Sequence, residues 1–122
     1  MYKAIKAALE AVPELSGKVF PVGFITDKVR GACCCYSVEG PDPVRSMSGR
    51  VLHWSAKFTA DVLAPDYDDC QSIYMEIQTA METIAALPGM LTLEVTCPEI
   101  DAWAAEVDRF RKRVVIALEW RY

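Results

Sequence analysis

Hydrophobic and polar residues alternate most strictly over residues 50–63, where apolar side chains occupy every second position. This period of two predicts a β-strand with one buried face and one face turned to solvent. Each large buried side chain stabilises a fold by about 1.5–3 kcal/mol. The large apolar side chains that we expect on the buried face are Leu52, Trp54, Phe58 and Val62. His53, the only histidine, falls on the polar face and is expected to meet solvent.

Strand character recurs elsewhere in the chain. Four further segments show it: residues 18–25, 32–38, 91–97 and 110–122. In the first of these, Pro21 and Gly23 favour an edge or irregular strand, because proline lacks a ladder donor and glycine weakens pairing. Residues 99–106 fit a helical turn or a loop equally well, so we expect irregular structure there.

Two segments place apolar residues at helical spacing, which predicts two amphipathic helices. The first covers residues 2–12 and is ended by Pro13. The second, longer helix ends at Leu87, before a Pro-Gly pair that terminates the pattern. Carboxylates favour the positive N-terminal end of a helix and accept from its free amides. We expect capping of the second helix by Asp66, Asp68 and Asp69.

Together these elements predict an α+β fold. Segregated helices and hairpin-length connections favour a mixed or antiparallel sheet of about five strands, with the N-terminal helix and the long helix packed on one face. The 122 residues fit a single domain over residues 1–122.

Composition and charge narrow the function classes. A net charge of −4 gives no general attraction to nucleic-acid phosphates, and no apolar run approaches the roughly 18 residues of a membrane span. Lys3, Lys6 and Glu10 interrupt any signal-peptide core, so we expect no export signal. Without one, an odd count of five cysteines indicates reduced thiols.

Candidate chemistry is sparse, and we expect no catalytic, cofactor or metal site. The run Cys33, Cys34 and Cys35 lacks the spacing of a zinc site. Neighbouring strand residues point to opposite faces, so Cys33 and Cys35 should share one face and behave as small buried hydrophobes. The common phosphate-loop, serine-elbow and zinc-helix motifs do not occur. The alternative is a thiol enzyme using Cys34 or Cys35, which requires a lowered thiol pKa.

Two segments suggest interaction surfaces. Arg109, Arg111, Lys112 and Arg113 could form a basic patch, or they could be the charges that discourage pairing at a strand edge. Residues 40–49 carry strong turn chemistry after the 32–38 strand and predict either an exposed arm or an ordinary hairpin loop. The residues of this arm that we expect to contact a partner are Asp42, Arg45, Met47 and Arg50.

The overall pattern resembles the tail-completion or tail-terminator proteins of long-tailed bacteriophages and prophages, a family of small α+β subunits. The resemblance spans nearly the whole chain. It rests on the N-terminal helix, the first strand from Gly17 to Pro21, the strands Cys35–Val38 and Trp54–Val62, the covering helix from Asp69 to Leu87, and the Arg109-Phe110-Arg111 lead into the strand Val114–Trp120.

The resemblance implies a non-enzymatic subunit of a hexameric ring on the head-proximal end of the tail tube. Its expected partners are further copies of itself, the tail tube protein and the head–tail connector protein, with DNA contact only where DNA passes through the ring. Such a protein is made in the cytoplasm of the bacterial host and resides in the virion tail or neck. Another neck component, such as a head-completion or minor capsid protein, remains an open alternative.

Overall fold

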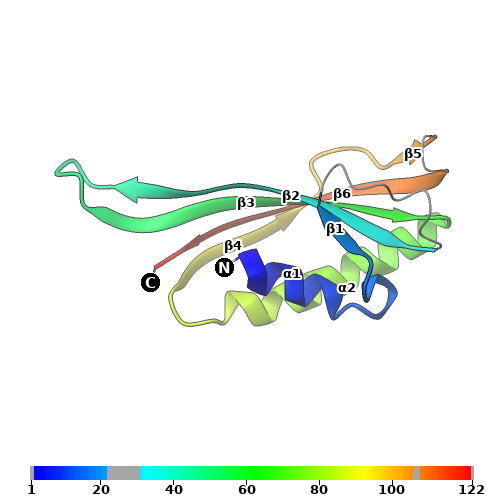
Figure 1. The fold of residues 1–122 in the computed structure, drawn as a ribbon, viewed down its shortest axis with the longest axis horizontal. Coiled ribbons are helices and arrows are strands. Elements are labelled where there is room, and N and C mark those ends of the chain that lie inside the picture. The colour runs from blue at the N-terminus through cyan, green and yellow to red at the C-terminus, as the bar shows by residue number, and fades with distance from the viewer. Residues whose placement is uncertain (1, 22–30, 106–107, 122) are drawn as a thin grey trace.

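The computed structural model describes residues 2–21, 31–105 and 108–121 (Figure 1). Its elements are α1 (Tyr2–Glu10), a 3-10 turn η1 (Pro13–Leu15), β1 (Val19–Pro21), β2 (Cys33–Arg45), β3 (Val51–Ala64), α2 (Tyr67–Ala85), β4 (Met90–Thr96), β5 (Ala102–Ala104) and β6 (Arg109–Trp120). The predicted α+β fold is confirmed, with six strands in one sheet rather than about five. The additional strand, β5, lies in the segment expected to be irregular, and residues 22–25 of the first predicted strand lie outside the described residues.

The sheet is mixed. Its strands follow the order β1-β2-β3-β6-β4, and β5 also pairs with β6. β1 runs parallel to β2, and the other pairs are antiparallel. The C-terminal strand β6 therefore lies inside the sheet, with β3 on one side and with β4 and β5 on the other, so it is not the edge strand that one interpretation required.

Both helices cover the same face of the sheet (Figure 1), as predicted. Their apolar stripes pack on alternate residues of the strands, and this burial of amphipathic elements supplies most of the stability of such a fold. Fully buried residues of the strands on this face include Phe58, Ala60, Val62, Val114 and Ile116, and those of the helices include Ile5, Leu9, Ile73 and Ile77. The other face, which we call the open face, has no helix over it among the described residues.

The ends of α2 follow the predicted chemistry. The side chain of Asp66 accepts a hydrogen bond from the backbone N–H of Asp68 at 3.0 Å, which satisfies one of the free amides of the first turn. After the helix, Gly89 has a φ of +86°, and a Cβ there would collide with the carbonyl oxygen of Arg121. Only glycine fits this close approach between the connection and the C-terminal strand.

Candidate partner-binding surface

The segment expected to be a loop is a two-stranded β-ribbon. β2 does not end near Val38 but continues to Arg45, and it pairs with β3 as far as Val51. Only residues 46–50 form the turn, so the predicted loop over 40–49 was wrong in its bounds. Prolines are tolerated here because β1 stops opposite Tyr36, which leaves this part of β2 at an edge of the described sheet.

A β-bulge lies at the base of the ribbon, close to where the pairing of β3 with β6 begins. The register of β2 against β3 shifts between Glu39 and Asp42, where one strand contains an extra residue. Gly40 has a φ of +94°, and a Cβ there would lie 2.9 Å from the carbonyl oxygen of Ser55. Bulges bend a strand and increase its twist, and the ribbon extends well beyond both helices (Figure 1).

The ribbon tip is a tight turn held by its own hydrogen bonds. The backbone N–H of Ser46 donates to the carbonyl of Arg50 at 2.8 Å, and that of Gly49 donates to Ser46 at 2.9 Å. Arg45 Nη1 donates to the carbonyl of Gly49 at 2.9 Å. The turn therefore gathers three of the predicted contact residues, Arg45, Met47 and Arg50, and Met47 is fully exposed.

The ribbon also exposes an apolar residue that was expected in the core. Leu52 is 48% exposed, because β3 at this point has passed both the helices and its pairing with β6, which begins at Trp54. The prediction of a buried Leu52 was therefore wrong, and Trp54 is only half-buried. The rest of the predicted buried face, including Phe58 and Val62, is confirmed.

Asp42, the fourth predicted contact residue, lies apart from the tip in a groove on the open face. The groove encloses about 440 Å³ at the base of the ribbon and is lined from β2, β3, β6 and β4. Its charged lining residues are Glu39, Asp42, Glu94, Glu119 and Lys57. Four carboxylates thus face a single ammonium group, and we call this site the acidic groove.

Of these carboxylates, only Glu119 is within ion-pair distance of a basic side chain in the described chain, and Glu39 faces Lys57 across the strands. His53, expected to meet solvent, has a side chain only 20% exposed, and its Nε2 lies 3.3 Å from the carboxylate of Glu119. Within the described part of the chain, no ion pair joins Glu39, Asp42 or Glu94 to another residue. The acidic groove therefore retains negative charge that the fold does not neutralise.

The far end of the open face is different, because its charges are paired. Arg113 donates to both carboxylate oxygens of Asp61, at 2.8 and 3.2 Å, and to Glu99 at 3.0 Å. These hydrogen bonds, with the charge of Asp61, raise the pKa of Arg113 above its ordinary value. Glu99 also accepts from Arg111 at 3.3 Å. Arg109 donates to the carbonyl of Gly31. The predicted basic run is therefore bound into the fold and forms no free patch.

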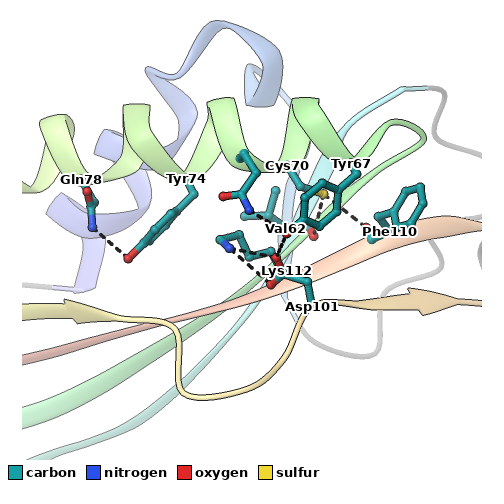
Figure 2. Close-up of polar contacts among 9 residues, drawn as sticks. Val62, Tyr67, Cys70, Tyr74, Gln78, Asp101, Phe110 and Lys112 are labelled. Carbon is teal, nitrogen blue, oxygen red and sulfur yellow. Dashed lines mark hydrogen bonds and ion pairs between the residues drawn. The ribbon is translucent and has the colours of Figure 1, made fainter.

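A buried ion pair ties the fourth residue of this run to the helix side of the sheet (Figure 2). Lys112 Nζ donates to the two carboxylate oxygens of Asp101 at 3.0 and 3.3 Å, and Tyr67 donates to the same carboxylate at 2.8 Å. Burial alone would raise the pKa of Asp101, but the hydrogen bonds from Lys112 and Tyr67 outweigh it and lower that pKa. Burial would lower the pKa of Lys112, but the bond to Asp101 raises it. Lys112 Nζ also lies 4.9 Å from the centre of the Tyr74 ring.

The cysteines lie on the faces that strand alternation predicts. Cys34 belongs to the core under the helices, whereas Cys33 is buried outside that core and Cys35 is half-buried. All five cysteines are free thiols. Burial raises the pKa of Cys33 and Cys34, and it raises the pKa of Cys35 and of Cys70 to about 11. None of these four thiols has the lowered pKa that a thiol enzyme needs.

The described residues contain no metal centre and no membrane-spanning helix, and no known family matches the chain. Across residues 2–21, 31–105 and 108–121, no group of three or more His, Cys, Asp or Glu side chains is arranged to hold a metal ion. No helix in the same residues is both long and apolar enough to cross a bilayer. The chain matches no family model and no curated protein.

Sequence reasoning located the ribbon tip but missed the groove. Glu39 and Glu94 come from β2 and β4, which are far apart in the sequence and are brought to one face by the strand order. Each is an outward-facing polar position in a strand, and that signal alone does not reveal which strands become neighbours. Only the insertion of β6 between β3 and β4 assembles the groove.

Proposed function

We propose that this chain is a structural subunit of a bacteriophage or prophage tail, which assembles as a hexameric ring on the head-proximal end of the tail tube. There it stops tube growth and offers a docking surface for the head–tail connector. The observation that supports this function is the projecting ribbon, with Met47 and Leu52 exposed beside two arginines. A ring of identical subunits needs a contact in which one surface of each copy meets a different surface of the next.

Two further features favour assembly over catalysis. Burial raises the pKa of Cys34 and Cys35, so both thiols are protonated at neutral pH and are poor nucleophiles for a thiol enzyme. The acidic groove is open to solvent, and its charged lining residues are four carboxylates and Lys57. A polar groove of this kind suits recognition of a protein surface.

The decisive experiment measures solution mass by light scattering across protein concentration, alone and with assembled tail tubes of the matching phage. We expect a species of about six times the 13.6 kDa chain, and electron microscopy should show it at one end of each tube. Unassembled tube protein is the control, because it presents no tube end. A monomer that ignores tubes would overturn the proposal, and binding to the connector alone would favour another neck component.

A further inference from the structure

The unneutralised charges of the ribbon tip and the acidic groove are opposite in sign. Residues 43–56 contain no carboxylate, and besides His53 their only charged groups are Arg45 and Arg50. Both arginines are exposed at the tip. The acidic groove holds Glu39, Asp42 and Glu94 without an ion-pair partner in the described chain. One molecule thus carries a basic projection and an acidic recess.

The tip does not reach the groove of its own chain. A strand rises about 3.3 Å per residue, so Arg45 lies about 10 Å along β2 from Asp42 and about 20 Å from Glu39. No ion pair in the described residues joins a tip arginine to a groove carboxylate. Because the ribbon is paired along its length, it cannot fold back without losing its ladder. The complementary partner of each surface must come from another molecule.

We propose that the ribbon tip of one copy docks in the acidic groove of a second copy, so that Arg45 and Arg50 face Asp42, Glu94 and Glu39 of its neighbour. This contact rests on the proposed ring and supplies its lateral interface. It is heterologous, because tip and groove are different surfaces, and such contacts close into rings when the rotation per subunit allows. Each copy then uses its own tip once and its own groove once.

A second cavity of about 250 Å³ lies near the ribbon base on the helix side and is a poorer receptor for the tip. It is lined mainly by apolar side chains, including Tyr2, Val38 and Trp120, and its charged residue is Lys3. Bringing arginines to this cavity would place like charges together, which disfavours the contact. Of these two recesses, charge favours the groove on the open face as the docking site.

The test uses charge reversal on each surface separately. The tip variant is Arg45→Glu/Arg50→Glu, and the groove variant is Asp42→Lys/Glu94→Lys. Asp42 and Glu94 face Ser55 and Ala117 across the strands, so their reversal places no like charges opposite each other. Glu39 is left unchanged because it faces Lys57.

Each variant alone should lose self-association by at least about a hundredfold, measured as the dissociation constant from light scattering. An equimolar mixture of the two should recover the mass of the native ring. In that mixture the reversed tip meets a reversed groove, and the native tip meets a native groove. Matched controls with the same change in net charge are Lys3→Glu/Lys6→Glu and Glu10→Lys/Glu82→Lys, all on the helices and outside both surfaces. These controls should assemble normally.

The outcomes separate this contact from the proposed function. If the native protein forms a ring and the tip variant keeps it, the contact is wrong and the tail function stands. If assembly depends on tip and groove but the ring ignores tube ends, the contact stands and the tail function fails. A mixture that stays monomeric, or a native protein that is monomeric both alone and on tubes, overturns the contact.

Discussion

The two ends of the open sheet face carry similar charged residues, which form ion pairs at one end and, in the described chain, mostly lack them at the other. At the end near β5, Arg113 is bound by Asp61 and Glu99, and Arg111 shares Glu99. At the ribbon end, Glu94 and Arg50 have no ion-pair partner among the described residues. The same side-chain chemistry is satisfied within the chain at one end and left unsatisfied at the other.

Under the proposed assembly, this difference separates the charges that stabilise the fold from those that contact a partner. Exposed ion pairs add little stability, typically below about 1 kcal/mol, so the paired end mainly fixes the position of residues 99–101 against the sheet. Unpaired charges of one sign gathered in a recess cost stability through repulsion, and they are retained more readily where a partner neutralises them.

The sharpest contrast lies within β3 itself. Phe58→Ala should lower the free energy of unfolding by about 3–5 kcal/mol, because it opens a cavity in the packed core. Leu52→Ala, on the same face of the same strand, should change it by only about 0.5 kcal/mol, because that side chain is already half in solvent. Urea unfolding of the monomer would measure both. Equal losses would mean that the ribbon is covered by the rest of the chain.

The contrast between Phe58 and Leu52 also shows how far a sequence pattern reaches. Alternation correctly identified the strand and its face, since a period of two depends only on local backbone geometry. It did not indicate where the helices end over that face, because this depends on how α1 and α2 pack. Leu52 therefore follows the pattern of a core residue without a core above it.

The site was predictable in the same partial way. Exposure and turn chemistry pointed to Arg45, Met47 and Arg50, which the structure gathers at one tip. Gly40 and its neighbouring prolines were read as the end of a strand, whereas at an unpaired edge they are accommodated in a bulge. The acidic groove needed the strand order, which no local signal in the sequence encodes.

The buried ion pair tests the paired end of the molecule. Lys112→Met should destabilise the protein by about 3 kcal/mol, because Asp101 is left charged and largely buried. The double variant Asp101→Leu/Lys112→Met should recover most of this loss, since removing both charges removes the desolvation cost. Thermal and urea unfolding would measure the two. A double variant as unstable as the single one would show that the lysine acts through packing alone.

The same pair predicts how stability depends on pH. The pKa of Asp101 is lowered by folding, so its contribution is present above its unfolded pKa of roughly 3.9 and is lost as pH falls through the folded value. The pKa of Lys112 is raised, so its contribution is present below roughly pH 10.4 and is lost as pH rises through the folded value. Both contributions are complete between about pH 5 and 9. Unfolding of the double variant at acid and alkaline pH should depend less on pH than that of the native protein, and equal slopes would contradict this origin.

The smallest effect on stability is expected at the ribbon tip. A small effect there would separate a role in association from a role in folding. Arg45→Glu/Arg50→Glu should change the unfolding free energy of the monomer by less than about 0.5 kcal/mol, because exposed residues without ion-pair partners contribute little to a fold. One hydrogen bond, from Arg45 to Gly49, is lost at an exposed site. Association should respond instead, and in the native protein it should weaken steeply between about 0.1 and 1 M salt as screening shortens from about 10 to 3 Å. The opposite result would be a native assembly that does not respond to salt and a tip variant that unfolds easily. The two arginines would then stabilise the fold and would not form the interface.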